Sequence, residues 1–296
     1  MKKNKSMKMS ALDIVLKTIN YTVLAFMVVI MLFPFWNILV KSFMIDEDIT
    51  RNALALWPVN WQFDGYKTIF EDKTYDFGRA FLNSVFVTGA DTLYQLAITT
   101  LTAYALTKKT LPGRKIITVY LMFTMYFGGG MIPYYLVIKS LNLLNSIWVM
   151  VIPSFISIFN VLVMKSFFEG LPEELLDAAR IDGAGEMRTF LVIVLPLSKA
   201  VLATIALFIA VGVWNNWFTP MLYIQDALKR PLAYTLQIII SRSSGSNTEN
   251  PGVGQVTVGE SIKYAAIVVA VFPIMAIYPF LQKHFTKGVL IGSVKG

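Results

Sequence analysis

Six apolar segments, each about 20 residues or longer, constrain the fold of this 296-residue chain more than any other feature. A helix crosses a hydrocarbon core with about 20 apolar residues. Because lipid offers no partner to an unpaired backbone group, each such segment must be helical. The sequence therefore predicts an all-α membrane protein with six transmembrane helices, at approximately residues 15–40, 81–106, 116–138, 147–168, 197–224 and 262–281.

The composition supports a membrane protein and excludes several other classes. Charged residues make up 15% of the chain, against about 25% in soluble domains. The net charge of +8 comes from basic residues in short loops and tails beside apolar segments, so no nucleic-acid partner is expected. The chain has no cysteine and a single histidine, His284, so no metal site is expected. There is also no paired nucleophile and base for catalysis.

The distribution of charge in the loops predicts the orientation in the membrane. Lysines precede the first segment, and Lys108, Lys109, Arg114 and Lys115 crowd the loop after the second. Positive loops stay in the cytoplasm, whereas the acidic loop 44–76 is expected outside. The sequence thus predicts a multi-pass membrane protein with both termini cytoplasmic. The expected divisions are an N-terminal tail at 1–14, a six-span domain at 15–283 and a C-terminal tail at 284–296.

A charged stretch at residues 169–196 separates the fourth and fifth apolar segments. Pro172 suits the first turn of a helix, and acidic residues follow it near the positive end of the helix dipole. Leu171, Leu175, Ala178 and Ala179 recur at helical spacing and predict an apolar stripe. Gly183 then predicts the helix end. The pattern fits either a plain connection between two spans or a contact surface at the cytoplasmic face.

The spacing of this stretch resembles the EAA motif of ABC-importer permeases. Asp177-Ala178-Ala179 is followed after three residues by Gly183, and after nine more by Ile193-Val194-Leu195-Pro196. The one departure is aspartate at the leading position, which keeps the negative charge. In that family the loop docks on a separate ATPase, so the resemblance implies an ATPase-coupling role for Glu174, Asp177, Ala178, Ala179, Gly183, Leu195 and Pro196.

The resemblance extends over nearly the whole chain. Residues 128–153 and 195–218 are similar to carbohydrate-uptake permeases of the MalG-like branch, in the subgroup of lipoprotein-linked complex-saccharide permeases. That subgroup includes a permease subunit of the bacterial alginate importer. The resemblance implies a type I ABC-importer permease fold in the bacterial inner membrane, with a cytoplasmic EAA coupling helix and working by alternating access. It also implies a second homologous permease in a heterodimer, two ATP-binding subunits and an extracytoplasmic sugar-binding protein.

The chain itself is expected to be a transport subunit and not an enzyme. It contains no G-x-x-x-x-G-K-[ST] sequence, so it cannot hold ATP by a P-loop. It is expected to bind no cofactor, since ATP and magnesium would be bound by the partner subunits. Its own contacts would be with membrane lipid and those protein partners.

Polar residues inside the predicted spans are candidates for the substrate pathway, because polar groups are costly in a membrane. Asp91 lies near the middle of the second span and either lines a path or bonds to a neighbouring helix. Asn160 is a pathway candidate, although its place in the fourth span favours a hydrogen bond to a neighbouring helix. Gly128-Gly129-Gly130 predicts a broken third span, with Tyr134 beyond it at a gate, at a path wall or in close packing.

Trp214-Asn215-Asn216-Trp217 in the fifth span combines two aromatic faces with two amides. Aromatic faces pack on the C–H faces of sugars and amides bond their hydroxyls, so these four residues are pathway candidates. The alternative is a helix end at the outer interface, where tryptophans are common.

The sequence leaves open the role of two long outer segments and three alternatives to the predicted function. Residues 45–75, with an amphipathic part at 63–70, and residues 225–260, with a Ser/Gly/Asn-rich loop at 241–254, either receive a partner or merely connect spans. The predicted function is uptake of oligosaccharides or polysaccharide fragments, with alginate-like polymers as one candidate. Alternatives are an ABC permease for another solute class, an ion-coupled secondary transporter using Asp91, and a membrane scaffold or sensor that transports nothing.

Overall fold

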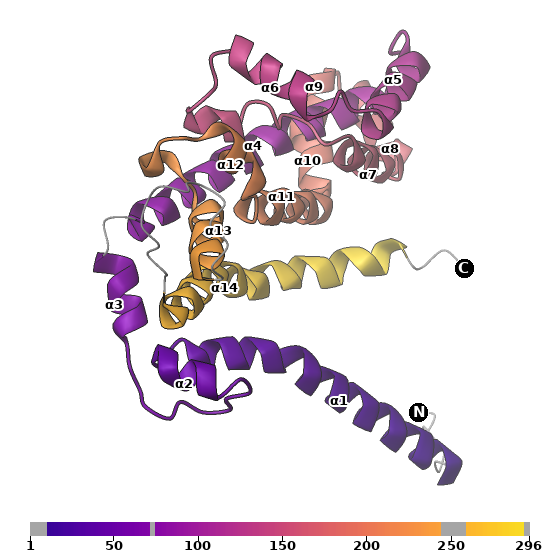
Figure 1. Cartoon of the computed structure of the whole chain (residues 1–296). Helices are drawn as coiled ribbons and strands as arrows, with labels where there is room; N and C mark the ends of the chain where they lie inside the picture. Colours follow the sequence, from indigo (N-terminus) through magenta and orange to yellow (C-terminus); the bar gives the residue numbers. More distant parts are fainter. Residues whose placement is uncertain (1–10, 72–74, 244–258, 293–296) are drawn as a thin grey trace. The chain divides into compact units, whose positions relative to one another are not determined.

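The computed structural model describes residues 11–71, 75–243 and 259–292, with the helix backbone alone for residues 11 and 277–292. In these ranges every regular element is helical (Figure 1). The elements are α1 (Ala11–Lys41), α2 (Asp46–Arg51), α3 (Asp64–Glu71), α4 (Phe77–Thr107), α5 (Arg114–Tyr126), α6 (Met131–Ser140), η1 (Ile147–Met150), α7 (Ile158–Glu169), α8 (Glu173–Ile181), α9 (Glu186–Thr189), η2 (Phe190–Val194), α10 (Leu195–Leu197), α11 (Lys199–Trp214), α12 (Phe218–Tyr223), η3 (Ala227–Lys229), α13 (Leu232–Ser243) and α14 (Glu260–Gly292). The predicted all-helical class is confirmed for these residues.

The predicted apolar segments are not all single helices. The first, second and sixth correspond to α1, α4 and α14. The third is divided between α5 and α6, which meet at 112°. The fourth comprises η1, irregular backbone at 151–157 and α7, and the fifth is divided between α11 and α12. By length and apolarity, one described helix (Leu12–Lys41) could cross a membrane by itself, or up to three spans if each of two bent pairs counts as one. The number of six spans therefore stays a prediction.

Proline and glycine explain where the helices break. Gly130, with a φ of +85°, precedes α6 and adopts a conformation that side chains disfavour. A helix continuing through Pro220 would press its ring against the carbonyl of Asn216, and α11 ends before this point. The segment 186–197, which contains the π-turn η2 and Pro196, meets α11 at an angle of 81° across Ser198.

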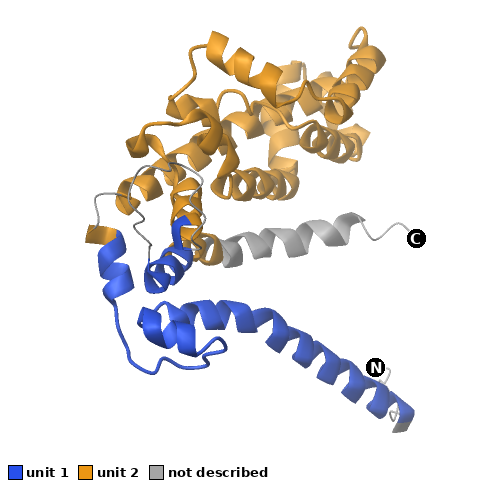
Figure 2. Ribbon diagram, viewed as in Figure 1, with its two compact units in different colours: residues 1–69, 242–268 blue, residues 70–241, 269–296 orange. Residues whose placement is uncertain are grey.

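Contacts divide the chain into two compact units, residues 1–69 with 242–268 and residues 70–241 with 269–296 (Figure 2). Most of the predicted N-terminal tail, the predicted C-terminal tail with His284, and most of the predicted loop 241–254 lie outside the described side chains. The predicted domain boundaries stay predictions.

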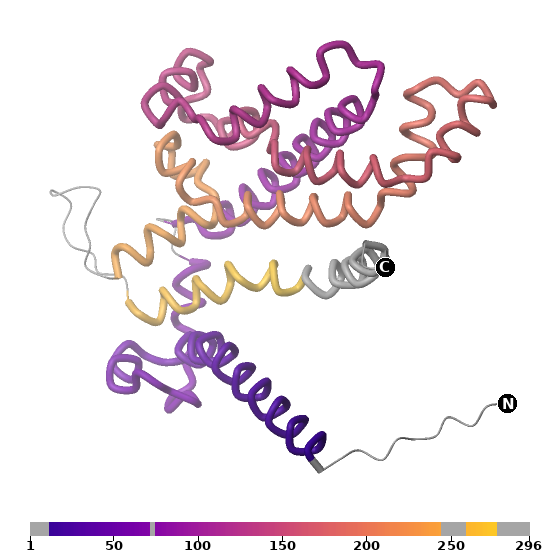
Figure 3. The backbone as a smooth tube through the Cα atoms, turned by 90° about the vertical axis from the view of Figure 1, so that its right-hand side faces the viewer, coloured from indigo at the N-terminus to yellow at the C-terminus, as the bar shows by residue number. Residues whose placement is uncertain are grey.

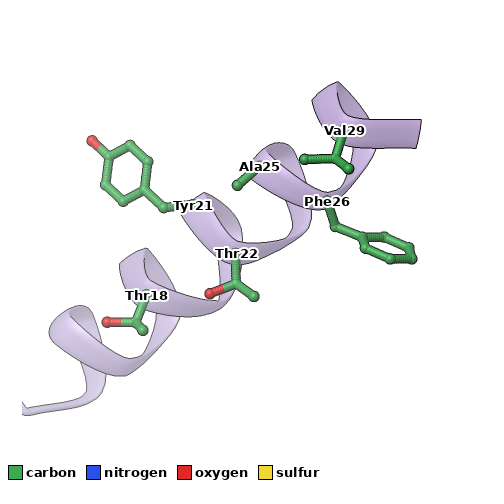
Figure 4. Close-up of a pocket in the computed structure, with 6 residues that line it drawn as sticks. All are labelled: Thr18, Tyr21, Thr22, Ala25, Phe26 and Val29. Carbon is green, nitrogen blue, oxygen red and sulfur yellow. The ribbon is translucent and has the colours of Figure 1, made fainter. Parts of the chain in front are cut away.

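In the first unit, the segment after α1 folds back against the end of that helix. Trp36 Nε1 donates to the carbonyl of Leu56 at 2.9 Å, and the amide of Asn37 donates to the carbonyl of Ala55 at 3.0 Å. The predicted amphipathic part at 63–70 is observed as α3. A shallow hollow of about 630 Å³ lies along one face of α1 (Figure 4). Only residues of this helix line it, so it is an open helix face: Thr18, Tyr21, Thr22, Ala25, Phe26 and Val29.

In the second unit, α4 packs along both α7 and α11 (Figure 3). The buried side of α4 repeats every three or four residues, as a helix face does. Its C-terminal half joins the main core cluster of Ala103, Leu106, Val161, Met164, Phe168, Phe190, Val194, Val201, Ile205 and Ile209. Its other half carries Asp91 and Gln95 toward the interior.

Ile205 provides a test of this core. It is fully buried, so Ile205→Ala leaves a cavity and is expected to cost about 2–5 kcal/mol of stability. The matched change on the same helix is Val211→Ala, because Val211 is exposed. Thermal unfolding in detergent should show a lower midpoint for the first variant and little change for the second. Equal midpoints would contradict this packing.

Candidate functional site

The stretch with EAA-like spacing, residues 169–196, forms α8, a glycine turn and α9 before the π-turn η2; we call it the coupling loop. Helix α8 ends at Gly183, whose φ is +73°. The N–H of Ala184 then reaches back to the carbonyl of Ala179 at 2.9 Å, which closes the end of the helix. The predicted helix end is thus observed, and it depends on a residue without a side chain.

The apolar stripe predicted for the coupling loop is only partly buried in this chain. Ala179 is buried, and Leu171 and Leu176 are half-buried against the core. Leu175 and Ala178, which the spacing placed on that stripe, are exposed. Because α8 has little more than two turns, only one edge of it reaches the core, and the remaining apolar residues of the stripe stay accessible to another surface.

The other predicted coupling residues lie mostly on the surface. Glu174, Asp177, Gly183 and Pro196 are exposed, while Leu195 is half-buried against the core. Asp177 forms an ion pair with Arg180 at 2.8 Å within α8. Their role in coupling stays a prediction, but their side chains are accessible to a partner.

One contact ties the coupling loop to α4. The Tyr104 hydroxyl of α4 donates to Glu186 Oε2 at 2.7 Å, and Lys108 Nζ lies 2.5 Å from the same oxygen. Lys108 also lies over the Tyr104 ring, 4.1 Å from its centroid. The hydrogen bonds from Lys108 and Tyr104 hold the pKa of the Glu186 carboxyl below its usual value. Glu186 therefore stays charged and bound to α4 at neutral pH.

A polar cleft of about 310 Å³ lies in the second unit, between α4, α6, α7 and α11. It brings together four residues that the sequence proposed for a pathway: Asp91, Tyr134, Asn160 and Asn216. The remaining lining residues are Gln95, Val149, Met150, Ser154, Ser157, Phe208, Ile209, Gly212, Val213 and Thr219. Hydroxyls, amides and one carboxylate thus converge on a single space.

Asp91 is held in place by two neighbours. Gln95 Nε2 donates to its Oδ2 at 3.0 Å, and the Ser154 hydroxyl donates to it at 3.0 Å. Asp91 is 1% exposed, and among the described lining residues it alone carries a charge. The bond to Ser154 confirms that Asp91 reaches a neighbouring segment, while its place in the cleft keeps the pathway interpretation open.

The breaks in the helices supply part of the lining. Ser154 and Ser157 come from the irregular backbone before α7, and Asn216 comes from the break between α11 and α12. Asn216 is fixed by its bonds to Thr219, with its Nδ2 donating to the hydroxyl at 2.9 Å and its Oδ1 accepting from the N–H at 3.1 Å.

Trp214, Asn215 and Trp217 are not among the lining residues of the cleft. Trp214 Nε1 donates to the carbonyl of Ala270 at 3.2 Å, and the Asn215 amide donates to the carbonyl of Val211 at 2.8 Å. These contacts match the helix-end interpretation of the four-residue sequence, because they stabilise the end of α11. Trp217 is partly exposed and packs edge-on against Phe218.

Several residues of both sites were missed by sequence reasoning. Gln95 lies one helical turn after Asp91 and was predictable from that spacing. Ser154 and Ser157 were hidden because the fourth segment was treated as one continuous helix. Tyr104 and Glu186 lie 82 residues apart in the sequence, so no local sequence pattern predicts their contact.

A family model and individual relatives all place this chain in the same protein family. A model described as the inner membrane component of binding-protein-dependent transport systems matches residues 6–291. Protein LplC of Bacillus subtilis (strain 168) is 43% identical over 272 residues, covering 90% of both chains. The polygalacturonan/rhamnogalacturonan transport system permease protein YtcP of the same organism is 40% identical, covering 93% of this chain and 96% of YtcP.

A solved structure agrees with this result. A chain of a bacterial ABC transporter involved in the import of the acidic polysaccharide alginate matches with a TM-score of 0.82 and 28% identity. The match covers 95% of this chain and 100% of that one. The predicted resemblance is confirmed by this match and by the family model.

The Asp91–Ser154 bond can be tested by a double-mutant cycle. Asp91→Ala leaves the buried Gln95 amide without its acceptor, at an expected cost of about 1–3 kcal/mol, whereas the Ser154 hydroxyl can still donate to the carbonyl of Val151 at 3.0 Å. Ser154→Ala and the double variant should reveal a coupling of about 0.5 kcal/mol or more in thermal unfolding. Strictly additive effects would contradict the bond.

Proposed function

Because this chain belongs to the inner-membrane permease components of binding-protein-dependent ABC transporters, we propose that it is the permease subunit of an importer for oligosaccharides or polysaccharide fragments. The observation that carries the substrate class is the polar cleft. Its hydroxyls, amides and carboxylate can donate and accept hydrogen bonds as sugar hydroxyls require, and its neighbouring apolar groups can cover sugar C–H faces. The printed names of a 40% identical relative and of the matching structure refer to polysaccharide import.

The cleft also bears on which saccharides this subunit would contact directly. Asp91 is the one charged group among the described lining residues. The carboxylate of a uronate would therefore face the Asp91 carboxylate, and no lysine or arginine among these residues would offset the repulsion. We therefore propose that the cleft binds sugar hydroxyls. For a uronate-containing substrate, the compensating cations would come from the partner permease or from elsewhere on the path.

The proposed topology has six spans with both termini in the cytoplasm. The spans are α1, α4, α5 with α6, η1 with α7, α11 with α12, and α14. Lys108, Lys109, Arg114 and Lys115 then face the cytoplasm, as basic loops do. The coupling loop lies on the same side, where a cytoplasmic ATPase can reach its exposed residues.

The proposed cycle is alternating access in an assembly with a second homologous permease and two ATPase subunits. A binding protein delivers the saccharide to the outward-facing state. ATP binding moves the ATPases and the coupling loop with them, and hydrolysis returns the permease to the inward-facing state. This chain would supply half of the path, and its partners would bind ATP and magnesium.

Purification of the chain with its native partners tests the proposal. The chain is extracted in mild detergent from its own membrane, and every co-purifying protein is identified. An ATPase, a second permease and a sugar-binding protein are the expected companions. A chain that purifies alone, and whose transport follows an ion gradient, would replace the proposal with a secondary transporter.

Gly183 gives a prediction on the coupling loop. Gly183→Leu forces a side chain into a φ of +73° and is expected to abolish uptake while the protein still inserts into the membrane. Gly185→Ala is the matched control, because Gly185 has an ordinary φ of −69° and open space around it. Uptake and membrane content are measured in the same cells. Wild-type uptake by Gly183→Leu would exclude a docking role for this turn.

A further inference from the structure

Three of the helices that wall the cleft need a connection to the coupling loop if the loop is to move them. Helix α7 runs directly into the loop, and α11 leaves it, so both are joined to it by the chain. Helix α4 carries Asp91 and Gln95 but has no such covalent connection, since it precedes the loop by more than sixty residues. A movement of the loop reaches α4 only through side-chain contacts.

The contact of Tyr104 and Lys108 with Glu186 has the geometry for this task. A hydroxyl and an ammonium group converge on one carboxylate oxygen, at 2.7 Å and 2.5 Å. Both donors lie in the last turn of α4 or directly after it, about 20 Å along the helix from Asp91. Since the body of α4 is a continuous helix, a displacement of its end is transmitted to Asp91 and Gln95.

We propose that Tyr104, Lys108 and Glu186 form a latch that couples α4 to the coupling loop, so that the α4 wall of the cleft moves when the ATPases move the loop. The inference rests on the proposed function, because it assumes that the coupling loop docks on an ATPase. Glu186 is thus a positioning residue that acts on the cleft through α4.

The latch is poorly suited to a purely stabilising role. The Glu186 side chain is 62% exposed, and ion pairs this exposed contribute at most about 1 kcal/mol. Burial of the Tyr104 ring does not need the hydroxyl, because its apolar contacts are with Phe190 at 4.8 Å and Phe168 at 6.4 Å between ring centroids. The polar contact instead fixes one point of the coupling loop to one end of α4, so a movement of the loop at that point pulls or pushes α4 with it.

The test uses the assembled complex with its partner permease and ATPases, and needs no transported substrate. The chain has no cysteine, so single cysteines can carry nitroxide labels. Gly89→Cys reports on α4 two residues before Asp91, and Gly212→Cys reports on α11. Both positions have open space for an added side chain. The readout is the change in nitroxide mobility on adding a non-hydrolysable ATP analogue.

The variants are Tyr104→Phe, which keeps the ring, and Glu186→Gln, which removes the charge. Either is expected to reduce the nucleotide response at Gly89 by about fivefold or more, as coupling between sites predicts, and to leave the response at Gly212. Glu169→Gln is the matched control, because Glu169 pairs with Arg114 and Lys165 and does not touch α4 in the described contacts. It should leave both responses intact.

An unchanged response at Gly89 in Tyr104→Phe overturns the latch, and so does an equal loss at Gly89 and Gly212, which would indicate general damage. If Glu186→Gln does not assemble, Tyr104→Phe alone decides. A wild-type complex without a nucleotide response at either position overturns the proposed function together with the latch. A wild-type response with unaltered variants overturns the latch only.

Discussion

Every backbone N–H and C=O group of a chain in hydrocarbon must find its partner inside the protein, and this requirement organises the whole molecule. It makes the apolar segments helical. It also restricts where a helix can break, because irregular backbone is tolerated only where it packs against protein or lines a cavity. Two breaks obey this rule at the same place. Residues 151–157 and the α11–α12 junction both contribute polar groups to the cleft.

The long helix α4 links the two regions for which we propose a role in transport. Its middle faces the cleft with Asp91 and Gln95, and its last turn meets the coupling loop through Tyr104. Between them, Thr99 and Ala103 are completely buried against neighbouring helices, so this part of α4 is held by packing. The part of α4 from Asp91 to Tyr104 thus has a polar contact at each of its ends, and as a packed helix it can carry a displacement from one contact to the other.

The sequence predicted what depends on local composition and missed what depends on tertiary contact. Helical segments follow from apolar length, and the end of α8 follows from Gly183. Pro153 lies in the break of the fourth segment and Pro220 follows the break of the fifth, but apolar length alone treated each region as one span. The four pathway candidates in the cleft were found because polar groups in apolar segments are rare. Trp214 and Asn215 share that rarity, yet they bond to α14 and α11 instead. The Tyr104–Glu186 contact joins distant residues, and no single-sequence pattern predicts it.

We propose that saccharide moves through this chain with energy received from ATPase subunits. Uptake is measured in proteoliposomes that contain the complete complex, with the binding protein outside and labelled neutral and uronate-containing oligosaccharides as probes. We expect uptake of at least one probe that requires both internal ATP and the binding protein. Uptake that persists without ATP and disappears when an ion gradient is collapsed would contradict it.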